Sequence, residues 1–191
     1  IDPECGEAYL GKLMVELEAE KQEDIVDYGI TFDDSSNYEK ILRFGNAKLI
    51  ATVKAYNEQI IRNNELERQK EVYDTAISIM REANTQKKFE EAAVAFESIS
   101  TYEDAVALAG ECHEKAEIAW RETAYTIARK KMSENRADAC EEAIKQLEII
   151  PGWRDADELL NACRQSLETL RVKEAAEQRF ENWFPVIFML I

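Results

Sequence analysis

The sequence predicts an all-α protein, in the form of a short α-solenoid of helical hairpins with long connecting helices. One segment recurs: Tyr73–Glu117 is repeated as Tyr125–Glu168, and Phe89–Cys112 aligns with Cys140–Cys163 at a constant offset of 51 residues. Repeats with a period in this range stack into helical arrays. Only three Pro and six Gly occur among the 191 residues, which suits helices joined by short turns. Apolar residues also recur at helical spacing through the long segments.

The first third of the chain is predicted to alternate between helix and loop. Asp2–Pro3 suits a helix start, with Asp as N-cap and Pro at the first helical position. Apolar residues up to Leu17 favour a helix of about five turns. The segment 23–37 has no sustained period and is expected to be a loop. A helix should restart near Tyr38, and Asn63–Asn64 is expected to interrupt it.

Each repeated unit is predicted to contain a short helix, a tight turn and a long helix. In the first unit the short helix covers about 89–98, and Thr101 and Asp104 form a start to the long helix that resembles a capping box. In the second unit the short helix covers 138–149 and the long helix about 153–182. Helical spacing continues past the end of the first unit, so the two units should share one long helix.

Small and large residues recur at related positions in the two units. Ala92 and Ala143 follow two glutamates at the start of each short helix, and Ala105 and Ala156 lie near the start of each long helix. Large residues fill the space between them: Phe96 and Leu147, Ile99 and Ile150, Tyr102 and Trp153. Interdigitated helix packing requires this alternation.

The recurring residues resemble those of a tetratricopeptide repeat (TPR). Residues 89–96, with Ala92 and Phe96 in phase, look like the second helix of that repeat. First-helix positions are similar as well: Tyr73, Ala76 and Met80. The resemblance covers residues 73–168 well and 1–60 loosely. Three features depart from the family: the unit is longer than about 34 residues, the Gly of the first helix is missing, and an extra helix follows.

The resemblance implies a degenerate, TPR-like helical repeat domain that binds proteins and carries out no chemistry. It is also similar to bacterial multidomain proteins in which such repeats accompany a zinc ribbon and a single membrane anchor. On this reading the chain is a fragment of a larger bacterial protein. The opening Ile1–Pro3, without Met or an apolar leader, favours the same interpretation.

The expected organisation has three parts. They are a degenerate N-terminal helical repeat region at 1–70, two TPR-like repeats at about 71–121 and 122–170 within a region 71–182 that ends in a C-terminal helix, and an apolar tail at 183–191. The apolar run 186–191 is too short to span a bilayer, which takes about 20 residues. Three interpretations stay open: the truncated beginning of a membrane anchor, a tail packed in a groove or swapped between chains, and a segment that is not native to the protein.

The charge balance narrows the class of partner. A net charge of −15 argues against binding to a phosphate backbone, which needs clustered Lys and Arg, and makes contact with an anionic membrane surface unfavourable. An acidic surface suits a basic partner, although it is more often simply solvated. We expect a cytoplasmic location, with a membrane tether in the full-length protein as the alternative.

The four cysteines do not form a metal motif. No Cys-x-x-Cys pair exists, and the single histidine, His113, follows Cys112 on a helix, so the two side chains point to different faces. Antiparallel helices would place Cys140 opposite Cys163, which leaves two alternatives: a disulfide, or two buried thiols that fill space. Cys5 lies apart from both.

Neither a calcium loop nor a catalytic arrangement is recognisable. An acidic loop is present, with Glu23, Asp24, Asp27, Asp33 and Asp34, but it lacks the alternating spacing of an EF-hand. The chain has one His, no Gly-rich phosphate loop and no Gly-x-Ser-x-Gly, so we expect no enzyme activity, no cofactor and no metal. A hydrolase would need two carboxylates in one buried cleft.

The function that this pattern favours is a non-enzymatic scaffold for protein–protein interaction. The expected binding surface is the groove lined by the first helix of each unit. Helical phase places four polar residues there: Arg81, Asn84, Arg129 and Lys130. The alternative is a peptide-sensing module that holds a short apolar peptide, with the composition of Phe184–Ile191, in the same groove.

Overall fold

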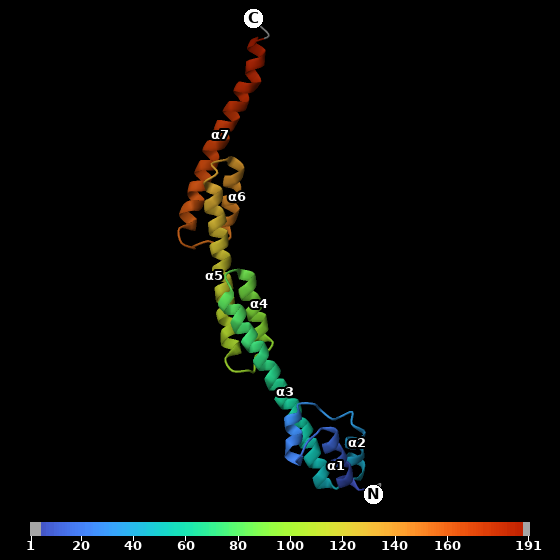
Figure 1. Ribbon diagram of the computed structural model, residues 1–191. Helices are drawn as coiled ribbons and strands as arrows, with labels where there is room; N and C mark the ends of the chain where they lie inside the picture. Colours follow the sequence, from blue (N-terminus) through green and yellow to red (C-terminus); the bar gives the residue numbers. More distant parts are fainter. Residues whose placement is uncertain (1–4, 189–191) are drawn as a thin grey trace. The chain divides into compact units, whose positions relative to one another are not determined.

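The structure is a computed structural model that describes the backbone of residues 5–188 and the side chains of residues 5–179. Over these residues all regular secondary structure is helical, which confirms the all-α class (Figure 1). The helices are α1 (Gly6–Glu16), the 3₁₀-helix η1 (Gln22–Tyr28), α2 (Ser36–Phe44), α3 (Ala47–Glu82), α4 (Gln86–Glu97), α5 (Ala105–Met132), α6 (Ala137–Glu148) and α7 (Ala156–Phe188).

The chain divides into two compact units. The first comprises Ile1–Thr75 with Ile99–Ala105, and the second comprises Ala76–Ser98 with Val106–Ile191. Because α3 runs from Ala47 to Glu82, one continuous helix contributes residues to both units.

The core of the first unit is aliphatic and aromatic. It gathers buried residues from α1, η1, α2, the first half of α3 and the segments that join them: Leu13, Leu17, Ile25, Phe32, Tyr38, Ile41, Leu49, Val53 and Ile60. Tyr38 packs edge-on against Phe32, with ring centroids 5.0 Å apart. Burial of these side chains is the main source of stability for the unit.

Helix α1 is shorter than expected. It has 11 residues, about three turns rather than five. Glu18 adopts φ 54° just after the helix, and the amide of Ala19 donates to the Met14 carbonyl at 2.8 Å, a bond that closes helix ends. This end lies one residue before the expected last apolar position, Leu17, so the helix is shorter because it begins at Gly6. The expected start at Asp2–Pro3 lies outside the described residues.

Helices α1 and α2 lie side by side because Gly6 in α1 meets Gly45 at the end of α2 (Figure 1). A Cβ added to Gly6 would lie 2.5 Å from the Cα of Gly45, and one added to Gly45 would lie 2.6 Å from the Ile41 carbonyl oxygen. Both contacts are with backbone, which cannot yield as a side chain can. The approach of the two helices therefore requires glycine at position 6, whereas glycine at position 45 is required by the turn between α2 and α3, whose own atoms lie nearest the added Cβ.

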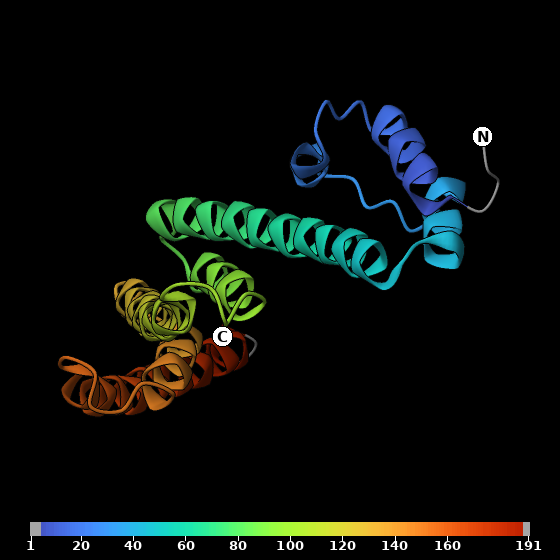
Figure 2. The same ribbon diagram turned by 90° about the horizontal axis from the view of Figure 1, so that it is seen from below.

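The expected loop at 23–37 is partly wrong, because it contains η1 and the start of α2. Gly29 ends η1 with φ 71°. The segment that follows runs beside the first half of α3 (Figure 2), held there by side chains of that helix. Asn57 accepts from the Phe32 amide at 3.1 Å and donates to Asp33 Oδ1 at 2.7 Å, and Asn64 donates to the Gly29 carbonyl at 2.8 Å.

The next two boundaries also differ from expectation. The Ser35 hydroxyl caps α2, which begins at Ser36, close to the expected Tyr38. The predicted interruption at Asn63–Asn64 is wrong, since α3 is continuous there. The break falls earlier, at Gly45 and Asn46, where the Asn46 side chain accepts from the Leu49 amide at 2.9 Å and so caps α3.

The predicted cap at Thr101 and Asp104 is wrong. Helix α5 begins later, at Ala105, and the Asp104 carboxylate accepts a hydrogen bond from Tyr73 instead. Helix α4 starts earlier than expected, at Gln86, because the Thr85 hydroxyl accepts from the Lys88 amide. The shared long helix is found as α5, which runs unbroken to Met132.

The last two helices pack against each other along α6 (Figure 1). Helix α6 lies within one residue of the predicted 138–149. Helix α7 begins at Ala156, after the turn that contains Trp153, and continues past the expected end at Asn182 to Phe188. The backbone of 183–188 is therefore helical, while the predicted tail residues 189–191 lie outside the described part.

The core around α6 draws on α5, α6 and α7. It holds Ala124, Tyr125, Ala128, Ala143, Leu147, Ile150, Ala156 and Cys163. Two pairs of positions 51 residues apart have the same burial: Ala92 and Ala143 are both 0% exposed, and Phe96 and Leu147 are 0% and 1% exposed. Small residues thus lie where helices approach, and large ones fill the space between.

Candidate interaction surface

In each of the two repeated segments a tyrosine donates a hydrogen bond to the turn that precedes the long helix. In the second repeat, Tyr125 of α5 donates to Asp155 Oδ1 at 2.6 Å, just before α7. In the first repeat, Tyr73 of α3 donates to Asp104 Oδ1 at 2.7 Å, just before α5. The turns also share backbone geometry, since Glu103 and Arg154 both adopt positive φ, at 44° and 51°. Related residues therefore hold the entry to both long helices in the same way.

Two arginines flank the Tyr125 ring. The guanidinium carbon of Arg154 lies 5.2 Å from the ring centroid and that of Arg129 lies 5.9 Å away. The hydrogen bond from Tyr125, then the backbone amide of Asp155 and the two arginines, lower the pKa of the Asp155 carboxyl. Arg154 also pairs with Glu122 at 3.0 Å. The result is an exposed charged cluster on a buried aromatic ring.

The four residues predicted to line a groove are all exposed. Arg81 lies in the last turn of α3 and Asn84 follows that helix, before α4. Arg129 and Lys130 lie in the last turn of α5, before α6. The structure thus places Arg129 and Lys130 on one turn, with Arg129 held against Tyr125. Among the described residues no hydrogen bond or ion pair joins either of them to Arg81 or Asn84.

Lys131 completes the basic turn that ends α5. Its ammonium lies 2.7 Å from Glu142 Oε2 on α6 and 3.4 Å from Glu134 Oε1, and these bonds raise the pKa of Lys131. Lys131 thus ties the end of α5 to α6, while Lys130 points to solvent. Sequence reasoning missed Lys131, because its partner on α6 is known only from the fold.

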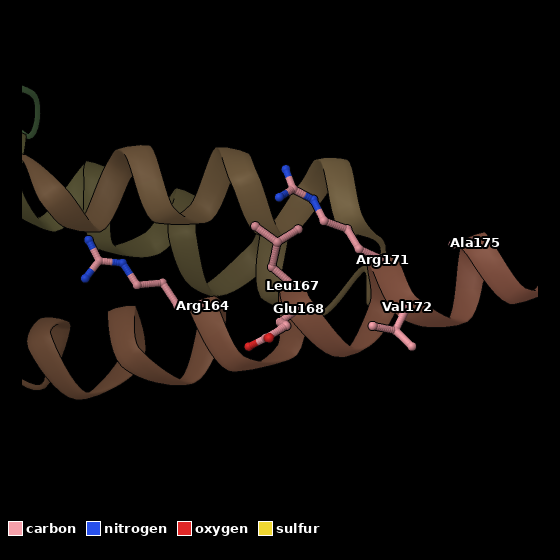
Figure 3. Close-up of a pocket in the computed structure, with 6 residues that line it drawn as sticks. All are labelled: Arg164, Leu167, Glu168, Arg171, Val172 and Ala175. Atoms are coloured by element: carbon pink, nitrogen blue, oxygen red, sulfur yellow. The ribbon is translucent and has the colours of Figure 1, made fainter.

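An open hollow on α7 was also missed. Arg164 reaches Glu148 on α6 at 2.8 Å and Arg171 reaches Glu141 on α6 at 2.6 Å. Figure 3 shows both arginine side chains leaving α7 on the side of α6, with Leu167 between them. Spacing would have placed these residues on one side of α7, but only the contacts with α6 show which parts of that side stay open.

All four cysteines are free thiols. Cys112, Cys140 and Cys163 are buried, and this burial raises the pKa of each thiol. Two alternatives were open for Cys140 and Cys163, and the structure shows two buried free thiols and no disulfide between them. Cys5 is partly exposed.

Buried polar groups are few among the described side chains. Ser35 and Asn57 are the buried polar residues among them, and both are engaged in hydrogen bonds. Within the same part of the chain, no cluster of three His, Cys, Asp or Glu residues is arranged to hold a metal ion. No helix in the described range combines the length and the apolarity needed to cross a bilayer.

In comparisons with known proteins, no family model, no curated protein and no solved structure matches the chain.

Proposed function

We propose that the chain is a non-enzymatic helical-repeat scaffold that binds another protein. The observation that carries the proposal is the recurrence of the same contact within each repeated segment. The bond from Tyr73 to Asp104 has its counterpart in Tyr125 to Asp155, at offsets of 52 and 51 residues. Repeated contacts of this kind favour a stacked solenoid, whose extended faces serve as binding surfaces.

A second recurring contact supports the same proposal. Glu97 of α4 pairs with His113 of α5 at 2.8 Å, and 51 residues later Glu148 of α6 pairs with Arg164 of α7 at 2.8 Å. Both pairs join a short helix to the long helix after it. Exposed pairs like these add little stability, so their value here is as markers of equivalent geometry. We therefore propose TPR-like hairpins, as in the bacterial multidomain proteins that the sequence resembles, and a cytoplasmic location.

The proposed contact surface is centred on the ends of α3 and α5. Arg81 and Asn84 supply the first part, and Arg129 and Lys130 supply the second. The three basic groups among them stand out in a chain of net charge −15, so they suit carboxylates or backbone carbonyls of a bound protein or peptide, and the Asn84 amide can donate to the same acceptors. Arg129 is already oriented by Tyr125, which lowers the entropic cost of binding.

The test is affinity capture with charge-reversed variants. The triple variant Arg81→Glu, Arg129→Glu, Lys130→Glu should lose the proteins that the wild-type chain captures from a lysate of its source organism. The matched control carries the same charge change at exposed lysines elsewhere: Lys48→Glu, Lys54→Glu and Lys70→Glu. Equal recovery by all three proteins would reject the proposed surface.

A further inference from the structure

Two aromatic rings, one from α1 and one from α2, stack at the surface of the first unit. The ring centroids of Tyr9 and Phe44 lie 6.2 Å apart, with an angle of 24° between the ring planes. The close approach of Gly6 to Gly45 brings the two helices together next to these rings. Both aromatic residues are only partly buried, so the pair forms part of the surface of the unit.

All three basic side chains of α1 and α2 gather on these two rings. The ammonium groups of Lys12 and Lys40 lie 5.1 and 5.3 Å from the ring centroid of Tyr9. The guanidinium carbon of Arg43 lies 5.2 Å from the ring centroid of Phe44. The electron-rich faces of aromatic rings attract cations, which offsets part of the repulsion between the three charges. We call these five residues the basic–aromatic cluster.

The carboxylates of α1 are engaged away from these cations. Glu16 accepts from the Ser35 hydroxyl and the Asn37 amide, both at 2.8 Å, rather than pairing with the lysine one turn before it. Glu7 accepts from the side-chain amide of Asn46 at 3.0 Å. Among the described residues, no cation of the cluster forms an ion pair. The positive charge of the cluster is therefore available to a carboxylate from outside the chain.

An open hollow adjoins the cluster, and Lys12 belongs to both. Its lining consists of Ala8, Gly11, Lys12, Val15 and Glu16 of α1 with Asn37 of α2. Val15 is 78% exposed, and a Cβ added at Gly11 would meet no atom within 4 Å. An exposed valine beside an open glycine leaves apolar area that gains from being covered. A ligand that covers the cluster and the hollow together needs acidic groups next to apolar ones.

The chemistry of the cluster favours an acidic protein segment over nucleic acid or a membrane. Cations already lie over both rings, so the rings are poorly placed to stack on bases, as proteins that bind single strands do. Three cations are few for a phosphate backbone or an anionic bilayer when the chain has a net charge of −15. A short acidic segment need only meet the cluster itself, because exposed charges farther than about 10 Å are largely screened at roughly 0.1 M salt.

We propose that the basic–aromatic cluster and the adjoining hollow dock an acidic, amphipathic segment of another protein. The carboxylates of that segment pair with Lys12, Lys40 and Arg43, and its apolar side chains cover Val15. Hydrogen bonds between ionised groups are stronger than neutral ones and fix the position of the bound segment. All of these residues belong to the first unit, so the inference does not depend on the surface proposed at the ends of α3 and α5.

Fluorescence anisotropy of short labelled peptides, titrated with the full chain, tests the docking. A peptide in which Glu and Leu alternate should bind, and its affinity should fall as the salt concentration rises. The variant Lys12→Gln, Lys40→Gln, Arg43→Gln should bind this acidic peptide about tenfold more weakly, or more weakly still. The matched control, which should bind as the wild type does, removes three charges at exposed lysines elsewhere: Lys54→Gln, Lys70→Gln and Lys87→Gln.

Two further variants separate the parts of the surface. Lys12→Arg with Lys40→Arg keeps both charges over the Tyr9 ring and should retain binding, since arginine also lies favourably over aromatic rings. Val15→Ser should weaken the peptide of alternating Glu and Leu and leave a peptide of alternating Glu and Ser unaffected. Far-UV circular dichroism of each variant checks that the helices are folded.

Several results would overturn the proposal. The first is equal affinity of the wild type for a peptide of alternating Lys and Leu, which denies charge complementarity. The second is equal binding of the acidic peptide by the cluster variant and its matched control. If Arg129→Gln with Lys130→Gln abolishes binding while the cluster variant keeps it, the peptide binds the other basic surface. Binding of single-stranded oligothymidylate or phosphatidylserine vesicles, without binding of the acidic peptide, would assign the cluster to nucleic acid or to a membrane instead.

Discussion

The Tyr125 hydroxyl donates a 2.6 Å hydrogen bond to Asp155 Oδ1, joining α5 to the turn that precedes α7. The bond spans 30 residues of sequence, so it holds a hairpin and not a local turn. Arg154, within the same turn, adopts a positive φ, which side chains other than glycine rarely favour. The tyrosine thus helps to hold a backbone conformation that the turn sequence alone does not prefer.

A Tyr125→Phe variant should be less stable than the wild type at neutral pH and nearly equal to it in acid. The folded protein lowers the pKa of Asp155 below 3.8, mainly through the Tyr125 bond. The stability that this carboxylate contributes is therefore present above pH 3.8, and it is lost as the pH falls through the lower pKa that Asp155 has in the folded protein. Urea unfolding at a series of pH values measures the difference. Tyr28→Phe, at a more exposed tyrosine, is the control.

Tyr73 should titrate well above an ordinary tyrosine. Its hydrogen bond to Asp104, with desolvation and nearby negative charge, raises the pKa of Tyr73 to about 12. Because the folded value lies above 10.0, the stability from this group is complete below pH 10.0 and is lost as the pH rises toward 12. Phenolate absorbance should show a smaller late step in Tyr73→Phe than in the wild type, with the remainder from Tyr38, whose pKa is raised by burial and by the nearby Asp33 and Glu58. A late step of unchanged size in the variant would contradict the assignment.

Ala143→Leu should destabilise the second unit by about 1–3 kcal/mol, because the added atoms overpack a site where helices meet. Ala143 is 0% exposed in the core around α6. Ala92→Leu, at the related and equally buried position of α4, should have a similar cost. Thermal unfolding followed by circular dichroism measures both. Val94→Leu, at a side chain that is 62% exposed, should change stability by less than about 0.5 kcal/mol.

Asn57→Leu should cost the first unit about 1–3 kcal/mol, because it leaves the buried Phe32 amide without its acceptor. Asn57→Asp restores an acceptor for that amide but loses the donor to Asp33 and places two carboxylates together. We therefore expect Asn57→Asp to regain stability as the pH falls through the carboxyl range. Asn63→Ala, at an exposed residue of the same helix, is the control for helix propensity.

In thiol labelling, one cysteine should react quickly and three should react slowly. Cys5 is partly exposed, whereas Cys112, Cys140 and Cys163 are buried with raised pKa. The thiolate is the reactive form, so both effects slow the buried groups. A chromogenic disulfide reagent should therefore give a fast phase of one thiol, with the others appearing on unfolding. Cys5→Ser should remove the fast phase; a fast phase that survives would show that a buried thiol is reached.

The amino-acid pattern alone predicted the all-α class and most helix interiors, because helical periodicity is a local property that each segment carries by itself. It also identified Ala92, Ala143, Phe96 and Leu147 as core residues. The TPR-like solenoid and the groove of Arg81, Asn84, Arg129 and Lys130 stay predictions. The hollow on α7 was not predicted, since it depends on how far α6 covers that helix.

Where helices begin and end was decided by tertiary contacts. Asn64 lies inside α3 rather than breaking it, and its amide holds the Gly29 carbonyl 35 residues away. Asp104 does not cap α5 as a Thr-x-x-Asp motif suggests, because it accepts from Tyr73. The same side chain can bond its own turn or a distant one, and local sequence does not reveal which partner the fold brings within reach.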